Sequence, residues 1–143
     1  MMTHTGLKIF VNGTFDVLHC GHLELLNYAA SLGDYLVVAL DSDERVKQLK
    51  GSTRPVNSIT TRKAIMSNLK AVSGTVSFGS DDELREVIKR YSPDIMVVGS
   101  DWRDKPIIGS EYAGRLEFYE RKNPVSTTST LKSYIDKLSE NNL

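Results

Sequence analysis

The 143 residues give a mass of 15.9 kDa, which is the usual size of one domain and too small for two ordinary ones. Hydrophobic residues make up 40% of the chain and charged residues 25%, a balance that excludes a largely disordered protein. Eighteen basic residues cancel 18 acidic ones, so no net charge draws the molecule toward nucleic acid or an anionic membrane.

Two further features bear on location and partners. The longest apolar run, residues 35–40, is far too short to cross a bilayer, and the first six residues lack a signal-peptide core. The single cysteine, Cys20, excludes an intrachain disulfide and is typical of a reducing compartment. We therefore expect a cytoplasmic protein of one domain over residues 1–143, with a frayed tail at about 139–143 and neither nucleic acid nor membrane as a partner.

The first part of the chain alternates strand and helix patterns. Residues 7–11 form a short β-rich run, and residues 21–32 carry leucines and alanines at helical spacing. Residues 35–40 are apolar almost throughout, which is typical of a parallel strand buried on both faces. These three segments predict a strand, a loop, a helix and a central strand.

The middle of the chain predicts two helices separated by a loop. Asp41 and Glu44 have the spacing of a helix start, and that helix is expected to end near Lys50. The polar residues 50–58 then form the loop. A second helix is marked by apolar residues at helical spacing, namely Ile65, Leu69 and Val72.

The remaining segments continue the alternation. Further strands are predicted at residues 74–78, 95–98 and 116–119. Ser80 and Glu83 form a capping box before a helix with an apolar stripe, and residues 128–138 predict a last helix. The alternation predicts an α/β fold, a single Rossmann-like doubly wound domain with a five-stranded, mostly parallel sheet.

In such a sheet ligands bind beyond the carboxyl ends of the strands, where the strand order reverses. The loops after Val11, Leu40 and Val98 are therefore the places to look for a site. The loop and helix start after the first strand, residues 12–22, read NGTFDVLHCGH. His19 and His22 lie three apart at the start of the expected helix, where free backbone N–H groups and the helix dipole favour a phosphate. The pattern favours an electrophilic cradle for a phosphoryl group.

Two other interpretations of the histidines are possible from these residues. A histidine pair is often structural or incidental, and a zinc site would need a third ligand from His4 or Cys20. The chain contains neither a GxxxxGK[ST] phosphate loop nor a GxGxxG turn after a strand, which disfavours P-loop and dinucleotide-binding proteins.

Residues 13–22, GTFDVLHCGH, resemble the GTFDxxHxGH signature of the cytidylyltransferase-like nucleotidyltransferases. That family includes glycerol-3-phosphate cytidylyltransferases and heptose-1-phosphate adenylyltransferases. Further stretches resemble the same family in the same order, namely KGSTRPVN at 50–57 with Arg62, GSDW at 99–102 and RKNPVSTT at 121–128.

The resemblance implies an enzyme that joins a nucleoside triphosphate to a phosphorylated small molecule and releases pyrophosphate. It also implies Mg²⁺ bound with the triphosphate, because the metal shields the charge that the second phosphate must approach. The residue that would hold the metal is not indicated. A homodimer is expected from the family as well.

The resemblance also implies roles for individual residues. The catalytic set is His19, His22 and Lys50. The nucleotide-binding set is Gly13, Thr14, Phe15, Arg62, Gly99, Asp101, Arg121, Ser126, Thr127 and Thr128. The acceptor-binding set is Asp16, Asp43, Lys47 and Arg54, of which the two aspartates could instead meet a metal.

Some of these residues have an ordinary structural alternative. Lys47 and Arg54 could be solvated cations of a polar loop. Asp101 could be a cap or turn residue, and one of the three hydroxyl residues at 126–128 could be a helix N-cap.

Different parts of the chain resemble family members that use different substrates. The KGSTRPVN block and Arg62 resemble heptose-1-phosphate adenylyltransferases, over a longer part of the chain. The RxxxxSTT spacing from Arg121 and the GSDW stretch resemble cytidylyltransferases, although residues 122–124 replace their usual TEG. We favour transfer of AMP to a heptose-1-phosphate-like acceptor. The alternatives are transfer of CMP to glycerol 3-phosphate and a nucleotide-binding module without turnover.

Overall fold

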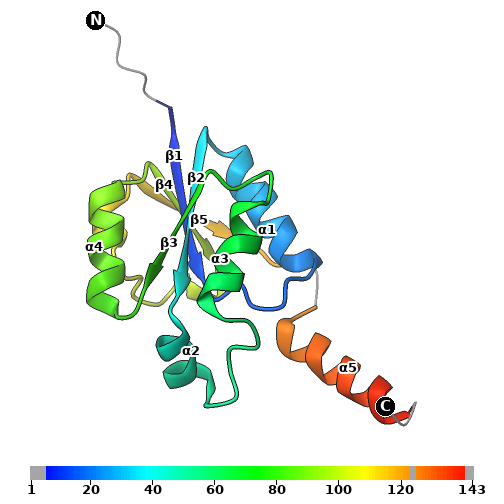
Figure 1. Cartoon of the computed structure of the whole chain (residues 1–143). Helices are drawn as coiled ribbons and strands as arrows, with labels where there is room; N and C mark the ends of the chain where they lie inside the picture. Colours follow the sequence, from blue (N-terminus) through cyan, green and yellow to red (C-terminus); the bar gives the residue numbers. More distant parts are fainter. Residues whose placement is uncertain (1–5, 123–124, 141–143) are drawn as a thin grey trace, which may run out of the picture.

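The computed structural model describes residues 6–122 and 125–140. Its sheet is made of strands β1 (Lys8–Gly13), β2 (Tyr35–Asp41), β3 (Gly74–Phe78), β4 (Ile95–Gly99) and β5 (Arg115–Tyr119). All four strand pairs are parallel, and the order across the sheet is β3-β2-β1-β4-β5 (Figure 1). The predicted five-stranded doubly wound fold is confirmed.

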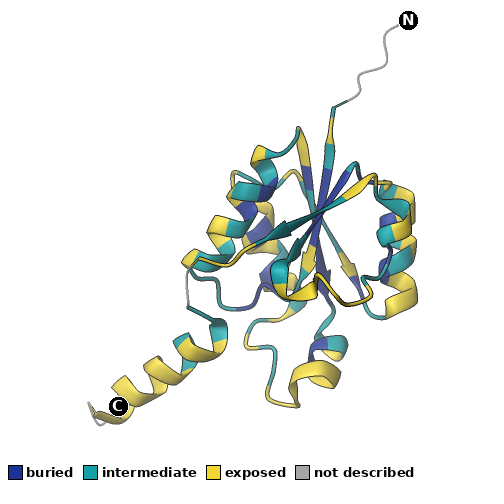
Figure 2. Cartoon of the chain, turned by 180° about the vertical axis from the view of Figure 1, so that it is seen from behind, coloured by how far each residue is buried: buried dark blue, intermediate teal, exposed yellow. Residues whose placement is uncertain are grey.

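Helices cover both faces of this sheet. Helices α1 (Cys20–Ser31) and α3 (Ile59–Ser67) lie on one face, and α4 (Asp81–Tyr91) lies on the other (Figure 1). Neighbouring residues of β1 supply the two cores, because successive side chains of a strand point to opposite faces. Val11 packs in the cluster that contains Leu26 and Met66, and Phe10 packs in the cluster that contains Leu84 and Ile88. Figure 2 shows the buried residues concentrated along the central strands.

The strand order reverses at β1. The chain moves from β1 outward to β2 and β3, and then returns to β4 on the other side of β1. The loops after β1 and β4 therefore flank the crevice in which open α/β sheets bind ligands. Two short 3₁₀ helices, Ser100–Trp102 and Ser110–Tyr112, lie between β4 and β5.

Helix α2 (Asp43–Lys50) begins one residue later than the sequence pattern indicates. Asp41 was predicted as its cap, but Asp41 still belongs to β2, where it is in register with Phe78 of β3. Ser42 is the N-cap instead, and its Oγ accepts from the Arg45 N–H at 3.2 Å. Because Asp41 is not the cap, its carboxylate bonds to the side chains of Thr14 and Arg45 at the carboxyl edge of the sheet.

Helix α3 differs more from its prediction. It begins after Ser58, ends at Ser67, and leaves Leu69 and Val72 in the connection to β3. Its buried positions are Arg62 and Met66, whereas Ile65 is 42% exposed. The apolar spacing predicted that the face with Ile65 would be buried, and this prediction is wrong. The buried face carries Met66 and Arg62, and an arginine does not contribute to an apolar pattern.

Helix α5 (Thr127–Glu140) projects from the body of the molecule and has no buried residue (Figures 1 and 2). It extends two residues beyond the predicted end. His4, Asn123, Pro124 and the last three residues of the expected tail lie outside the described residues. None of the helices in the described part of the chain is long and apolar enough to cross a membrane.

Candidate active site

The loop between β1 and α1 has a constrained backbone. Phe15 and Val17 have φ angles of 50° and 48°, a left-handed conformation that is unfavourable for residues with bulky side chains. Gly13 allows the preceding turn, since a Cβ there would lie 2.9 Å from Cε2 of Phe15. Backbone outliers of this kind occur where the surrounding structure holds a functional loop in place.

His19 and His22 form the N-terminal cap of α1. The Gly21 N–H donates to Nδ1 of His19 at 3.1 Å, and the His19 N–H donates to Nδ1 of His22 at 3.2 Å. The two rings lie 3.9 Å apart between centroids. A Cβ on Gly21 would lie 2.9 Å from Cε1 of His19, so this close arrangement depends on a glycine there.

These caps fix the tautomer of both rings. Because each Nδ1 accepts a backbone N–H, the proton of each neutral imidazole is on Nε2. Burial lowers the pKa of His22 to about 4, with contributions from His19, Arg121 and Lys50 that outweigh the opposite effect of Asp16. Burial and Arg121 also lower the pKa of His19. Two neutral Nε2–H donors are therefore held side by side at neutral pH.

A cavity of about 220 Å³ opens beside His22 at the carboxyl edge of the sheet. Its lining comes from β1 and the following loop, α1, the end of α2, the loop after it, and the start of α5. The residues are Asn12, Gly13, Thr14, Phe15, Asp16, His22, Leu25, Lys50, Arg54 and Thr127. Asn12 and Leu25 were not identified from the sequence, because neither residue type by itself indicates a ligand site.

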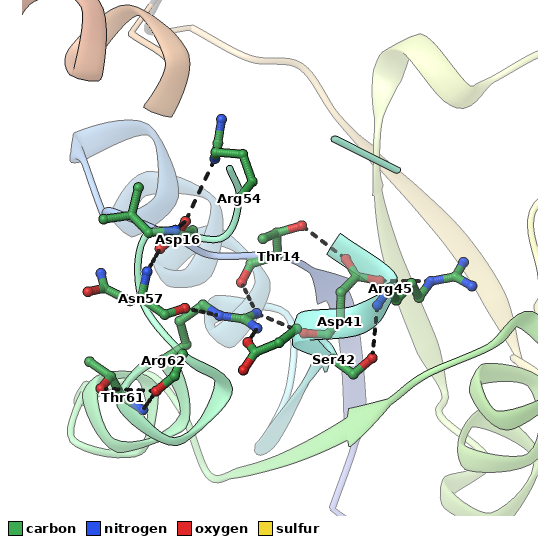
Figure 3. Close-up of polar contacts among 12 residues, drawn as sticks. Thr14, Asp16, Asp41, Ser42, Arg45, Arg54, Asn57, Thr61 and Arg62 are labelled. Carbon is green, nitrogen blue, oxygen red and sulfur yellow. Dashed lines mark hydrogen bonds and ion pairs between the residues drawn. The ribbon is translucent and has the colours of Figure 1, made fainter. Parts of the chain in front are cut away.

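Asp16 holds the neighbouring loops against this cavity. Its carboxylate is buried and accepts the N–H groups of Val56 at 2.6 Å and Asn57 at 3.0 Å (Figure 3). Its carbonyl accepts the Thr127 hydroxyl at 2.8 Å. One residue thus connects the β1 loop to the basic loop after α2 and to the start of α5.

Arg62 lies at the centre of a second group of contacts, also drawn in Figure 3. Its side chain is fully buried and donates to the carbonyls of Thr14, Asp41 and Asn57 at 2.8–3.0 Å. It also pairs with the Asp43 carboxylate at 2.7 Å. Arg62 therefore connects the end of β2 to the loops on either side of the cavity.

The carboxylate of Asp41 lies next to the cavity residue Thr14. From the sequence, Asp41 was predicted only as the cap of a helix. It accepts the Thr14 hydroxyl at 3.0 Å and the Arg45 Nε–H at 3.0 Å. The proton of the Thr14 hydroxyl is therefore directed to Asp41. The position of Asp41 at the end of a buried parallel strand was the available signal for this role.

Comparisons with known proteins agree with this geometry. Residues 10–132 match the family described as Cytidylyltransferase-like. The chain belongs to the cytidylyltransferase-like nucleotidyltransferase family. The family expected from the HxGH signature is thus confirmed, and with it an enzyme of the nucleotidyltransferase class.

Sequence relatives of this cytidylyltransferase-like chain include the Bifunctional protein HldE of two bacteria. The Helicobacter hepaticus protein is 41% identical over 125 residues, which cover 87% of this chain and 26% of that protein. The Campylobacter jejuni protein is 40% identical over 129 residues, or 90% of this chain and 28% of that protein. The chain spans about a quarter of the length of these relatives.

Solved structures share the fold of this cytidylyltransferase-like domain. A lipopolysaccharide core biosynthesis protein from Thermoplasma volcanium has a TM-score of 0.65 at 23% identity, covering 85% of this chain and all of the other. A pantoate-beta-alanine ligase from Francisella tularensis has a TM-score of 0.58 at 13% identity, covering 90% of this chain and 66% of the other.

The structure brings together only part of the residue set that the family signature implied. Cavity residues in that set are Gly13, Thr14, Phe15, Asp16, His22, Lys50, Arg54 and Thr127. His19 stacks on His22, and Arg121 influences the pKa of both histidines. Besides His19 and Arg121, the predicted residues that do not line the cavity are Asp43, Lys47, Arg62, Gly99, Asp101, Ser126 and Thr128.

Besides the ion pair of Arg62 with Asp43, two more of these non-lining residues have structural contacts. Ser126 caps α5 through reciprocal hydrogen bonds with Ser129, each at 3.0 Å. The carboxylate of Asp101 lies over Gly99, where a Cβ would be 2.7 Å from Oδ1. Their predicted contacts with nucleotide stay predictions.

Proposed function

We propose that the protein transfers AMP from ATP to the phosphate of a heptose-1-phosphate-like acceptor and releases pyrophosphate. An oxygen of the acceptor phosphate attacks the α-phosphorus and forms the new P–O bond. The bond from the α-phosphorus to the bridging oxygen breaks, and pyrophosphate leaves with the electron pair. The observation that carries this proposal is the pair of Nε2–H donors held beside a cationic cavity.

In this proposal the protein supplies charge stabilisation and orientation. The acceptor phosphate is already an anionic nucleophile, so no covalent intermediate with a side chain is required. His19 and His22 donate to triphosphate oxygens on which charge increases, without becoming imidazolium ions. Lys50 supplies a full positive charge next to them.

Mg²⁺ fits this proposal as a companion of the triphosphate. Both Asp16 oxygens accept backbone N–H groups, and both Asp41 oxygens have side-chain partners. Within the described ranges, no three His, Cys, Asp or Glu side chains gather as a possible metal site. The donors present therefore suit an ion bound chiefly by phosphate oxygens, which would reduce the repulsion between the two substrates.

The preference for an adenylyl donor and a heptose-1-phosphate-like acceptor rests on similarity. The KGSTRPVN loop resembles heptose-1-phosphate adenylyltransferases, and relatives about 40% identical carry the name HldE. The second candidate is a glycerol-3-phosphate cytidylyltransferase. It is favoured by the RxxxxSTT spacing from Arg121. Thr127, which belongs to that stretch, is one of the lining residues of the cavity.

The experiment that tests this function is a matrix of substrates. Pyrophosphate release is measured with each of the four nucleoside triphosphates, combined with heptose 1-phosphate, glycerol 3-phosphate and other sugar phosphates. We expect release with ATP and heptose 1-phosphate. Release only with CTP and glycerol 3-phosphate would favour the second candidate. Nucleotide binding without release in any combination would favour a binding module.

We also propose a homodimer, as the family resemblance implies, and a cytoplasmic location, for which the single cysteine is the supporting observation. Sedimentation at working concentration tests the oligomeric state, for which a monomer alone would be the contrary result.

A further inference from the structure

The hydroxyl of Thr14 is oriented by a residue that does not itself line the cavity. Thr14 is a lining residue, and its Oγ donates to Oδ2 of Asp41 at 3.0 Å. Asp41 is buried at the end of β2, in register with Phe78 of β3, and is not among the described residues of the lining. Asp41 therefore acts on the cavity through Thr14.

The other oxygen of the Asp41 carboxylate is held as well. Oδ1 accepts the Arg45 Nε–H at 3.0 Å, so the two carboxylate oxygens face different side chains (Figure 3). The same guanidinium pairs with Asp81, the first residue of α4, at 2.7 Å and lies 5.3 Å from the centroid of the Phe78 ring. Contacts with α2, α4 and β3 thus fix the carboxylate, and with it the direction of the Thr14 proton.

This direction decides which ligand groups Thr14 can bind. A hydroxyl has one proton and two lone pairs, and the proton of Thr14 is used by Asp41. Only lone pairs remain for the cavity. An ionised phosphate oxygen is an acceptor and would also be repelled by the carboxylate behind Thr14. A ligand hydroxyl, which can donate, suits this position better than a phosphate does.

The surroundings indicate which substrate supplies that hydroxyl. Asn12, two residues before Thr14, lines the same cavity with a neutral amide that both donates and accepts. Asp41 ends β2, whereas Gly99 and Asp101, which are predicted to bind nucleotide, end and follow β4 on the other side of β1. The hydroxyl is therefore assigned to the second substrate, the acceptor.

We propose that Thr14 is a specificity-determining residue that accepts a hydrogen bond from a hydroxyl group of the acceptor, and that Asp41 is the positioning residue that directs it. This inference rests on the proposed nucleotidyl transfer and moves Thr14 from the nucleotide to the uncharged part of the acceptor. An acceptor that has no hydroxyl at this point, or an oxygen there that cannot donate, binds less tightly.

The first test measures acceptor binding without turnover. The protein is saturated with an ATP analogue that has a methylene bridge between the α- and β-phosphorus, and heptose 1-phosphate or inorganic phosphate is titrated by calorimetry. In Thr14→Val, which replaces the hydroxyl by a methyl group, the dissociation constant of heptose 1-phosphate should rise about 3- to 10-fold, the effect of losing one neutral hydrogen bond. The dissociation constants of inorganic phosphate and of the analogue should stay within about twofold.

The second test examines the direction of the hydrogen bond. Monodeoxy analogues of heptose 1-phosphate identify the hydroxyl, since its removal should weaken binding to the wild-type protein and not to Thr14→Val. Fluorine at the same carbon accepts but cannot donate, so the fluoro analogue should bind the wild-type protein no better than the deoxy analogue.

Asp41→Asn should reverse this preference. The asparagine keeps an oxygen for Arg45 and presents a donor to Thr14, which turns the Thr14 proton toward the cavity. In this variant the fluoro analogue should bind about 2- to 5-fold more tightly than the deoxy analogue. A purely structural role of Asp41 would weaken both analogues equally, and that result would overturn its positioning role.

Two control variants accompany these tests. Thr75→Val makes the same substitution in β3, at a hydroxyl that contacts Ser67 and is outside the cavity lining, and should change none of the affinities. Thr14→Ser keeps the hydroxyl and should retain most of the affinity for heptose 1-phosphate.

The outcomes separate this inference from the proposed function. Unchanged heptose 1-phosphate affinity in Thr14→Val would overturn it, and so would an equal loss for inorganic phosphate or the ATP analogue. A loss that disappears with a 2′- or 3′-deoxyribose analogue would assign the hydroxyl to the nucleotide and contradict the inference. Wild-type protein that binds glycerol 3-phosphate and not heptose 1-phosphate would contradict the proposed acceptor; the Thr14→Val comparison with glycerol 3-phosphate then supports or overturns the role of Thr14.

Discussion

His19 and His22 perform two tasks that usually belong to different residues. Their Nδ1 atoms cap α1, a role that serine and glutamate commonly take in a capping box, while their Nε2 atoms remain available as donors. The hydrogen bonds of the helix cap thus fix the orientation of the two Nε2–H groups. The role of the pair was predicted from HxGH spacing, but the cap was not, because histidine is an uncommon capping residue.

This double role allows the two tasks to be separated by mutation. His19→Asn and His22→Gln each keep a side-chain oxygen suited to the cap while removing the imidazole. We expect turnover to fall by roughly 10²–10³, the usual effect of losing one preorganised donor, and the melting temperature to change little. Steady-state kinetics and thermal unfolding measure the two effects. A folded variant with wild-type turnover would remove that histidine from the reaction.

The pKa of His22 predicts how stability depends on pH. Because the folded protein lowers this pKa from 6.5 to about 4, the unfolded chain takes up a proton first as the pH falls. The contribution of neutral His22 is therefore fully present above about pH 6.5 and is lost as the pH falls toward 4. Urea unfolding across this range should show a shallower decline in the His22→Gln variant. Equal slopes in the two proteins would contradict the lowered pKa.

Among the elements, the loops at the carboxyl edge are joined to one another by polar contacts of single buried side chains. Asp16 binds two backbone N–H groups of the basic loop, and Arg62 binds three carbonyls and Asp43. The existence of these loops could be predicted from Gly, Pro and Ser content. Their mutual contacts could not, because they join segments up to 48 residues apart through single side chains.

The contacts of Arg62 make it important for stability. Arg62→Met would leave buried carbonyls without donors and Asp43 without its partner, at a cost of about 3–5 kcal/mol in the free energy of unfolding. Arg62→Lys keeps the charge but cannot reproduce the planar donor set, so it should recover only part of that loss.

Denaturant unfolding measures the effect on stability, and nucleotide titration of the folded variants measures the effect on binding. If Arg62 acts chiefly on phosphate, nucleotide affinity would fall while the free energy of unfolding stayed unchanged. That outcome would contradict a positioning role for Arg62.

For the whole molecule, the fold could be predicted because its strongest signals are local. The central strand at residues 35–40 is apolar almost throughout and mostly buried, and helix patterns of suitable length separate the strands, which leaves a parallel sheet with helices on both faces. The orientation of α3 could not be predicted, since it depends on a buried arginine. The projection of α5 could not be predicted either, because the helix pattern of residues 128–138 does not say whether the helix packs on the sheet, and in the structure Ile135 is 61% exposed.

The location of the site also follows at this scale. A sheet that reverses at β1 places the HxGH loop at the crevice, and the same edge receives Lys50 from α2 and Thr127 from α5. Residues from distant parts of the sequence thus surround a single cavity. We therefore expect this cavity to receive the triphosphate beside His19 and His22.

The most direct test is a crystal structure with the methylene-bridged ATP analogue bound. We predict that Nε2 of both His19 and His22 donates to oxygens of the phosphate chain, at roughly 2.7–3.2 Å. We also expect the start of α5 to lie beside the same phosphates. A complex in which the phosphate chain lies away from both imidazoles, or in which their Nε2 atoms face protein groups, would contradict this prediction.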